Sequence, residues 1–400
     1  MTERLAQLMH AEADHLVVPP PNAGAALSQG RGLRRRRRFV TGATATAVVL
    51  VIGGGALAVN AITGDDKGSN ADPAAAFDSG AVFSIGATVY AANGEVEAAI
   101  EDKAIKSLYY TSAGVLVRHG NNPYSDGGGP QRFSIVRPDG SVDPIDVTTE
   151  ETVHSTDPTQ PYLAYAEETA AGVDVVLRDL RDDTEAARVS IPGPFDKNAW
   201  MPPPISLSGE LVYITTSPTA YVVDWRSGEV TATDAIEPGG YVEVHGGRET
   251  VDDRFQARVV DAATGETLLS APITQDQFGG FSLSPDGSYA LLSIEDMMAS
   301  GEAASTVDVY DVETGEHVSV PRNDYGWTVD GDLFSVSKGK LTTCDTATGD
   351  CTTVPHGIQM PPRSAPREVC ETFDGHEECY TEGGETWEGQ LKLGGRTYES

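Results

Sequence analysis

Four segments in the second half of the chain repeat one short pattern, in which an Asp is followed four residues later by a Gly and then by an acidic residue. The four copies are Asp224 to Gly228, Asp261 to Gly265, Asp311 to Gly315 and Asp345 to Gly349. β-Forming residues precede three of them, as in Val307-Asp-Val-Tyr310. Gly supplies the positive φ that a tight turn between two strands requires. The pattern therefore predicts one β-hairpin in several copies.

Weaker copies of the hairpin extend the series towards the N-terminus, at Asn93-Gly94, Asp139-Gly140 and Asp182-Asp183. The seven turns are spaced by 34 to 50 residues, with a mean of about 42, close to the roughly 40–50 residues of a four-stranded propeller blade. The sequence therefore predicts an all-β fold, a β-propeller of about seven blades, over residues 80–357, with six or eight blades as alternatives. A β-sandwich or a two-domain all-β chain is less favoured, because a sandwich does not repeat one hairpin seven times.

A second pattern of strand, turn and strand precedes some of these hairpins. It is clearest in Phe281–Leu292, where Ser284-Pro285-Asp286-Gly287 provides the turn, and it is degraded in Ile205–Val212 and Thr328–Phe334. With the Asp311–Gly315 hairpin, this pattern resembles the WD40-like and TolB-like β-propeller families over roughly residues 80–355. The resemblance implies a fold and leaves the function open, because propellers host binding, scaffolding and many chemistries.

The charge of the chain is acidic and unevenly distributed. The net charge is −32, whereas residues 1–38 contain seven Arg and only three acidic residues. A strongly acidic domain repels nucleic acid and anionic lipid, so the sequence predicts no nucleic-acid partner. The charge keeps a large exported domain soluble, or it serves to bind a cation or a basic ligand.

A stretch of 24 residues, 39–62, contains no charged residue. As a helix it would cross a bilayer core of roughly 30 Å. Five arginines directly precede it, Arg34, Arg35, Arg36, Arg37 and Arg38, and arginine beside a span is held on the cytoplasmic side. The sequence therefore predicts a single-pass protein of the cell membrane. Residues 1–38 would be cytoplasmic, 39–62 a transmembrane helix and 63–79 a polar linker to an extracellular propeller.

The same region also fits a twin-arginine export signal, at Arg36-Arg37-Arg38-Phe39-Val40. Small-residue motifs ending at Ala58 and Ala61 are candidate cleavage sites, and cleavage would release the domain. The anchor is favoured, because the apolar run exceeds the 7–15 residues typical of the apolar region of a signal peptide. The 38 residues before the run are also long for a leader.

In the cytoplasmic segment, the spacing of apolar residues predicts a short helix over residues 2–17. Its apolar face would contain Leu5, Leu8, Met9 and Leu16, and Glu12 interrupts that face. Such a helix needs a partner to bury its apolar residues. With Val17-Val-Pro-Pro-Pro21 and Arg31-Gly-Leu-Arg-Arg35, the layout resembles actinobacterial membrane proteins, some of which look like anti-sigma factors. The resemblance implies an alternative function, a transmembrane regulator that binds a cytoplasmic partner through residues 1–38.

All four cysteines, Cys344, Cys351, Cys370 and Cys379, lie in the part predicted to be outside the cell. An even number of cysteines in an exported domain indicates disulfides. Cys344 and Cys351 occupy positions that should face each other across the hairpin turn, which suits a cross-strand bridge. Four cysteines permit three pairings, and this spacing favours Cys344–Cys351 with Cys370–Cys379. The tail, residues 358–400, would carry the second bridge. Either this tail or residues 81–91 should close the propeller ring.

The sequence contains no nucleophile elbow, phosphate-binding loop, HExxH helix or dinucleotide fingerprint. The segment His245-Gly-Gly-Arg248 could admit a ligand, but a hairpin loop explains it more simply. Asp252-Asp253 and Asp330-Gly331-Asp332 could supply oxygen ligands to Ca²⁺, although acid–Gly turns are common without metal. We therefore predict no catalytic residue, no metal and no cofactor.

The predicted function is a non-enzymatic binding, sensing or scaffold role, with a protein or small-molecule ligand on the propeller loops, because loops on a rigid scaffold are where binding sites lie. A secreted propeller hydrolase or lyase is the second alternative. It would need His245, His317 and acidic residues to converge at the mouth of the central channel.

Overall fold

In a computed structural model, the chain divides into two units, Met1–Ser69 and Asn70–Ser400. All residues that the structure describes belong to the second unit, and they are 80–122, 130–149, 154–192, 203–253, 255–275, 277–296, 305–358, 367–373, 376–382 and 391–396. The predicted cytoplasmic helix, transmembrane helix and linker lie outside them. None of the described helical segments is long and apolar enough to cross a bilayer. The described residues form strands and one 3-10 turn, η1 (Ala92–Gly94), with no α-helix among them.

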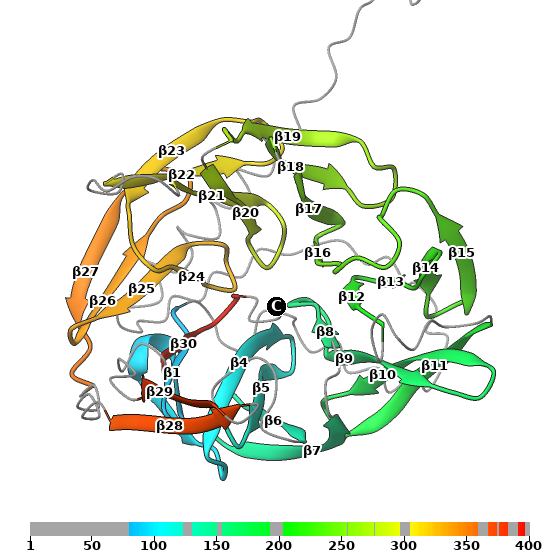
Figure 1. Cartoon of the computed structure of the whole chain (residues 1–400), viewed down its shortest axis with the longest axis horizontal. Helices are drawn as coiled ribbons and strands as arrows, with labels where there is room; N and C mark the ends of the chain where they lie inside the picture. Colours follow the sequence, from blue (N-terminus) through cyan, green and yellow to red (C-terminus); the bar gives the residue numbers. More distant parts are fainter. Residues whose placement is uncertain are drawn as a thin grey trace, which may run out of the picture. The chain divides into compact units, whose positions relative to one another are not determined.

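Seven four-stranded antiparallel sheets surround a central axis in the second unit, which confirms the predicted seven-bladed propeller (Figure 1). From the innermost strand outward, the first three blades are β30 (Leu391–Leu393), β1 (Phe83–Ile85), β2 (Thr88–Ala91) and β3 (Val96–Ala99); β4 (Ala104–Thr111), β5 (Gly114–Gly120), β6 (Gln131–Val136) and β7 (Val142–Thr149); and β8 (His154–Thr156), β9 (Tyr162–Glu168), β10 (Gly172–Asp179) and β11 (Thr184–Pro192).

The other four blades have the same order. They are β12 (Ile205–Ser208), β13 (Leu211–Thr215), β14 (Ala220–Asp224) and β15 (Glu229–Thr233); β16 (Val244–His245), β17 (Arg248–Asp253), β18 (Gln256–Asp261) and β19 (Thr267–Pro272); β20 (Gln277–Leu283), β21 (Tyr289–Asp296), β22 (Thr306–Asp311) and β23 (His317–Pro321); and β24 (Gly326–Trp327), β25 (Leu333–Ser337), β26 (Lys340–Cys344) and β27 (Cys351–Pro355). Between β27 and β30, the strands β28 (Arg367–Phe373) and β29 (His376–Glu382) form a separate hairpin.

The repeated Asp–Gly pattern forms the turn between the third and fourth strands of the blades. In the β14–β15 turn, Asp224 Oδ1 accepts the N–H groups of Arg226 (2.9 Å) and Ser227 (3.0 Å), and Gly228 donates to the Asp224 carbonyl (2.8 Å). Gly228 has φ +76°, which a residue with a Cβ adopts only with strain. The same bonds recur in the other three copies, at Asp261, Asp311 and Asp345.

The propeller ring closes where the two ends of the second unit meet. Strand β30, from the tail, pairs with β1, so that Phe83 lies opposite Leu393 and Ile85 opposite Leu391. The tail and the first strand, which the sequence offered as alternatives for closing the ring, therefore pair with each other. The pairing completes the first blade, which packs against the second blade and the seventh blade.

Each interface between neighbouring blades contains its own hydrophobic cluster, and seven such clusters are found among the described residues. The innermost strands are buried on both faces, as in β4, where seven of eight residues are buried, whereas all five residues of the outermost strand β27 are exposed. Blades therefore stabilise one another by burying apolar side chains between their faces.

Candidate functional site: a pocket at the end of the propeller channel

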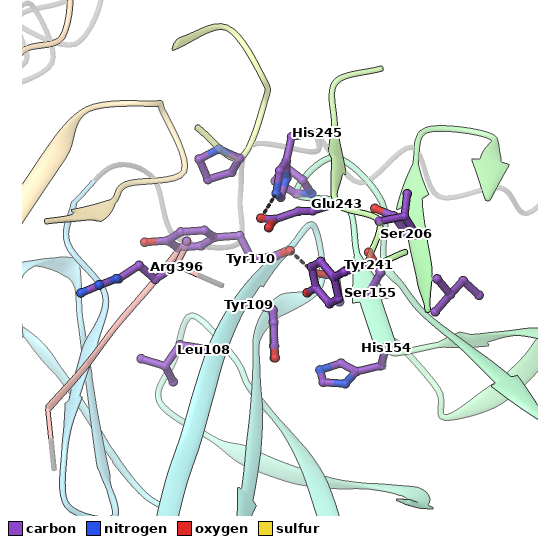
Figure 2. Close-up of a pocket in the computed structure, with 16 residues that line it drawn as sticks. Leu108, Tyr109, Tyr110, His154, Ser155, Ser206, Tyr241, Glu243, His245 and Arg396 are labelled. Carbon is purple, nitrogen blue, oxygen red and sulfur yellow. Dashed lines mark hydrogen bonds and ion pairs between the residues drawn. The ribbon is translucent and has the colours of Figure 1, made fainter. Parts of the chain in front are cut away.

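A pocket lies at the end of the ring where the innermost strands turn into the second strands (Figure 2). Its walls come from β4, β8 and β12, from the segment that leads into β16, from the β20–β21 turn, and from residues 395–396 after β30. It encloses about 580 Å³ of empty space, part of which is open to solvent. Segments far apart in the sequence meet here because the ring brings the same end of each innermost strand to the axis.

Hydroxyl groups tie neighbouring blades together around the pocket. Ser206 Oγ on β12 accepts the N–H of Val244 on β16 (2.8 Å), and Ser155 Oγ on β8 accepts the N–H of Leu207 on β12 (2.9 Å). Thr156 on β8 donates to a main-chain carbonyl of β4 (3.1 Å). Four successive blades are thereby linked in order, which fixes the backbone on which the pocket side chains stand.

His245 and Glu243 form the charged pair of the pocket (Figure 2). His245 Nε2 lies 2.7 Å from Glu243 Oε1, and the two side chains are 24% and 29% exposed. Burial alone lowers the pKa of His245. The hydrogen bond and charge of Glu243, with the charges of Asp157 and Asp286, outweigh that effect and raise the pKa above its ordinary value. Near neutral pH, His245 is therefore protonated more often than an isolated histidine.

Three tyrosines line the pocket, Tyr109 and Tyr110 from β4 and Tyr241 from the segment before β16. Tyr110 is buried, and its hydroxyl donates to the carbonyl of Trp327 (2.8 Å). The Tyr109 ring meets the His154 ring edge-on, with the centroids 4.7 Å apart. Tyr241 is 41% exposed, so its ring is reachable from solvent. The pocket therefore offers aromatic surface held in fixed orientation by β4 and one accessible ring beside it.

Acidic side chains surround this end of the ring. Three of them stand in the turns that follow innermost strands, Asp157 after β8, Asp286 after β20 and Asp330 after β24. Arg396, which lines the pocket, forms an ion pair with Asp324. These acids and Glu243 outnumber the basic groups His245, Arg248 and Arg396 at this end of the ring, and Asp157, Asp286 and Glu243 act electrostatically on His245.

The segment His245-Gly-Gly-Arg248 is the β16–β17 turn, as the simpler interpretation of the sequence had it. A Cβ on Gly246 would lie 2.1 Å from the Asp286 carbonyl oxygen, and Arg248 Nη1 donates to the Gly287 carbonyl (2.6 Å). The glycine pair therefore lets this turn approach the backbone of the next blade, and the arginine fastens the contact. His245 faces the pocket, which the Gly–Gly motif alone did not predict.

A second polar cluster, which the sequence did not suggest, joins Asp102, His119 and Ser134. His119 Nδ1 lies 2.7 Å from Asp102 Oδ2, and His119 Nε2 lies 3.0 Å from Ser134 Oγ. This order of groups can activate a serine nucleophile. Ser134, however, is only 6% exposed and does not line the pocket. The cluster instead ties the loop before β4 to β5 and β6.

Arg132 completes this cluster, with Nε and Nη2 lying 2.8 and 2.6 Å from Asp102 Oδ2. Burial alone raises the pKa of Asp102, but hydrogen bonds from His119, the Lys103 amide and Arg132 outweigh it and lower the pKa. The buried carboxylate is therefore held ionised.

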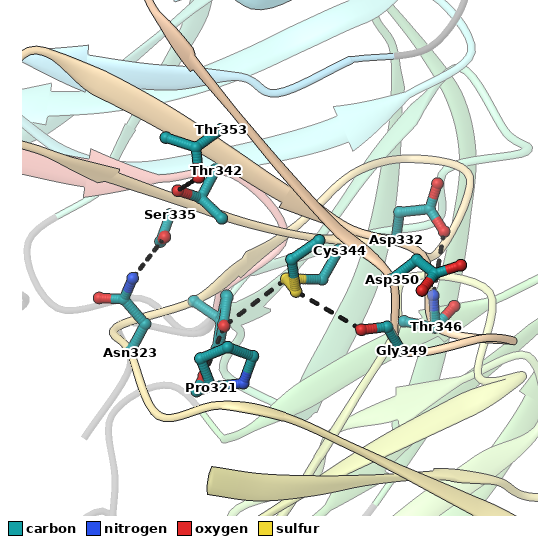
Figure 3. The surroundings of a disulfide bond; sticks show 12 residues. Pro321, Asn323, Asp332, Ser335, Thr342, Cys344, Thr346, Gly349, Asp350 and Thr353 are labelled. Atoms are coloured by element: carbon teal, nitrogen blue, oxygen red, sulfur yellow. Dashed lines mark hydrogen bonds between the residues drawn. A yellow bond between two sulfur atoms is a disulfide. The ribbon is translucent and has the colours of Figure 1, made fainter. Parts of the chain in front are cut away.

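Cys344 and Cys351 are joined by a disulfide across the β26–β27 hairpin, as the spacing predicts (Figure 3). They are register partners with a Cα–Cα distance of 4.0 Å. The Tyr325 hydroxyl oxygen lies 3.7 Å from Cys344 Sγ, so neighbouring residues cover the buried half of the bridge. Cys370 and Cys379 are register partners in the β28–β29 hairpin, and the disulfide between them stays a prediction.

The remaining sequence candidates are dispersed or lie outside the described residues. Arg34 to Arg38, with the topology they predict, belong to the second group. His317 stands on the outermost strand β23, where its ring stacks on Tyr310, so it does not approach His245 on β16. Within the described ranges, no three His, Cys, Asp or Glu side chains come together as metal ligands. Asp332 Oδ1 instead accepts the Thr346 amide (3.3 Å).

No protein-family model matches the chain, and no curated protein matches it. Among solved structures, hydrazine synthase of Kuenenia stuttgartiensis is similar at 15% identity and a TM-score of 0.38, over 61% of this chain and 77% of that one. TolB of Acinetobacter baumannii is similar at 13% identity and a TM-score of 0.34, over 69% and 63%. Hsv2p of Kluyveromyces lactis has 13% identity and a TM-score of 0.36, over 61% and 75%. At these identities the likeness concerns the fold alone.

Proposed function

We propose that the chain is a single-pass membrane protein whose extracytoplasmic propeller binds a ligand in the channel pocket without transforming it. The observation that carries this proposal is the pocket itself, a concave site built from the innermost strands and lined in part by the chain after β30. Ligand sites in proteins are usually concave, with apolar and aromatic walls and a few converging polar groups. The tyrosines, His245 and Glu243 provide that combination.

Binding is favoured over catalysis because the hydroxyl groups in the pocket are already used by the fold. Ser155 and Ser206 accept main-chain N–H groups, and Thr156 donates to a main-chain carbonyl. A nucleophilic hydroxyl needs a base within hydrogen-bond reach, and the bonds that these three groups make go to the backbone. The hydrogen bond of His245, the candidate base, goes to Glu243 Oε1 and not to any of these three hydroxyl groups.

The membrane anchor is proposed from two features of the sequence, the uncharged stretch 39–62 and the five arginines before it. It is tested by expressing the chain with a different tag at each end, fractionating the cells and measuring the intact mass. A full-length chain in the membrane fraction, with its C-terminal tag accessible from outside, supports the proposal. A soluble product that begins after Ala58 or Ala61 refutes the anchor. It also removes the alternative of a regulator acting through residues 1–38.

Binding at the pocket is tested with a fragment library containing cationic, neutral and anionic compounds, detected by ligand-observed NMR on the full chain in detergent micelles. Fragments that bind the wild type should lose affinity in Tyr241→Ala, which removes the accessible ring of the pocket. Tyr221→Ala, a change of the same size on β14 of a neighbouring blade, should leave binding unchanged. A library from which nothing binds, or from which hits are indifferent to Tyr241→Ala, refutes ligand binding in the pocket.

A further inference from the structure

We infer that the pocket takes an organic ammonium ion, and that the imidazolium of His245 competes with this ligand for the carboxylate of Glu243. The inference rests on the proposed binding function and names the chemical class of the ligand. It follows from three features: the aromatic surface of the pocket, the acidic groups in the turns around it, and the contact of His245 with Glu243, the one carboxylate among the described lining residues.

The aromatic surface suits a cation. Ammonium ions are attracted to the faces of tyrosine rings within about 6 Å, through the negative face of the π system. Tyr110 is fixed by its bond to Trp327, and Tyr109 is fixed against His154. Tyr241 is 41% exposed and stands on the segment that also carries Glu243, two residues further along. A ligand that contacts this ring is therefore placed near the carboxylate.

The charge of the surroundings also favours a cation over an anion. Asp157, Asp286 and Asp330 stand in the turns around this end of the channel, and the chain as a whole carries a net charge of −32. Arg396, the arginine in the pocket wall, has its charge compensated by Asp324. An anionic ligand would enter against this field, whereas a cationic ligand is drawn in by it.

Competition by His245 follows from its contact with Glu243. Its Nε2 already occupies the position, 2.7 Å from Glu243 Oε1, that the N–H of an ammonium ligand would take. While His245 is protonated, the ligand must displace or approach a like charge. Once His245 is neutral, the repulsion between the imidazolium and the ammonium ligand disappears. Affinity should therefore rise with pH through the titration of His245.

Other charged and titratable groups face His245 from the elements packed around it. They are Glu243 before β16, Asp157 after β8, Asp286 after β20, Arg248 on β17, His154 on β8, Tyr109 and Tyr110 on β4, and Arg396 after β30. Among them the carboxylates of Glu243, Asp157 and Asp286 raise the pKa of His245. The His245→Gln variant therefore distinguishes the contribution of His245 to a pH-dependent change in ammonium binding from that of His154 in the pocket wall.

The experiment compares three probes that share a phenyl ring and a two-carbon chain: 2-phenylethylammonium, the neutral 2-phenylethanol and the anionic 3-phenylpropanoate. Each is titrated into the full chain in detergent micelles between pH 5.5 and 8.5. The ammonium probe should bind most tightly and gain affinity as the pH rises. Glu243→Gln should weaken it on the order of tenfold at pH 8.5, the size expected for losing one partly screened charge contact, and should abolish the pH dependence.

Matched variants separate the pocket charge from the general charge of the domain. Glu210→Gln removes an exposed carboxylate in the β12–β13 turn that does not line the pocket, and it should change ammonium affinity less than twofold. His245→Gln keeps a neutral hydrogen-bond donor beside Glu243. It should make ammonium binding at pH 5.5 as tight as at pH 8.5.

Tighter binding of the neutral or anionic probe, or equal effects of Glu243→Gln and Glu210→Gln, overturns the ammonium inference. The proposed binding function survives that outcome if any probe or library fragment binds in a Tyr241-dependent way. Ammonium binding that persists without pH dependence in the wild type overturns the competition by His245. Failure of the whole fragment library is the separate result that removes the binding function itself.

Discussion

Glu249 on β17 is a carboxylic acid buried in an apolar interface between blades, and it should make the stability of the propeller depend on pH around neutrality. The residue is 5% exposed, and Oε2 has no hydrogen-bond partner among the described residues. Its register partners are Val244 on β16 and Val260 on β18, and residues in register on adjacent strands share a face. Val244 packs with Tyr213 of the preceding blade.

The magnitude follows from the proton affinity of Glu249 in this environment. Burial raises the pKa of Glu249 from 4.5 to about 7, because desolvation disfavours the charged form. The protonated acid therefore stabilises the folded chain fully below pH 4.5, and this contribution is lost as the pH rises through 7. Since a tenfold change in proton affinity corresponds to about 1.4 kcal/mol, the loss amounts to about 3 kcal/mol.

The perturbation is Glu249→Gln, which keeps the shape of the side chain and cannot ionise. We expect the variant and the wild type to differ little near pH 4.5, and the variant to become more stable by about 3 kcal/mol above pH 7. The assay is chemical denaturation of both chains at half-unit pH steps from 4.5 to 8.5, read as the difference in free energy of unfolding. The control is Glu229→Gln, at an exposed position on β15. A difference between Glu249→Gln and wild type that stays flat across this pH range refutes the reasoning.

Three further perturbations test the fold. Replacing Cys344 and Cys351 together by Ala should lower the free energy of unfolding by about 2 kcal/mol, because the bridge closes a loop of sequence separation 7. Addition of a reductant to the wild type should cause the same loss. An effect of the double replacement smaller than that of Val354→Ala would contradict this prediction. Asp102→Asn should cost about 2–3 kcal/mol at pH 7 by breaking charge-assisted bonds to His119 and Arg132. Because the pKa of Asp102 is lowered, its contribution is present above pH 3.8 and is lost as the pH falls below that value, so the gap between variant and wild type should narrow in acid-denaturation curves. Leu393→Ala, at a 1% exposed position on the closing strand, should cost about 3 kcal/mol in denaturant unfolding, whereas the exposed Val354→Ala should be nearly neutral.

The blades could be predicted from the sequence because the hairpin is a local structure. Three hydrogen bonds accepted by an Asp, and one positive-φ Gly, lie within six residues, and each copy carries the same signal. The register also follows from the turn. Val260 pairs with Thr267 and Tyr310 with His317, as their positions relative to the Gly predict, and Cys344 pairs with Cys351 in the same way.

The pocket could not be predicted, because no short segment contains it. Tyr110, His154, Glu243 and Arg396 come from β4, β8, the segment before β16 and the tail, and only the closed ring brings them together. The Asp102 cluster could not be predicted for a similar reason. His119 lies 17 residues from Asp102 and 15 residues from Ser134 in the chain. The closing strand β30 has three residues, too few for a clear periodic signal.

The β16–β17 hairpin carries titratable groups on two sides, and this allows ligand binding and stability to be separated. His245 faces the pocket and Glu249 faces the neighbouring blade, and both have a raised pKa. Both therefore stabilise the fold more at low pH, and both lose this contribution as the pH rises. Their consequences for the pocket differ. Deprotonation of His245 removes a positive charge beside Glu243, whereas deprotonation of Glu249 places a negative charge in the interface with Tyr213. Glu249→Gln should therefore flatten the pH dependence of unfolding and leave that of ammonium binding intact. His245→Gln should abolish the pH dependence of binding while most of the pH dependence of unfolding remains. If either variant alters both profiles to the same extent, the hairpin moves as one body and the two groups cannot be treated as independent.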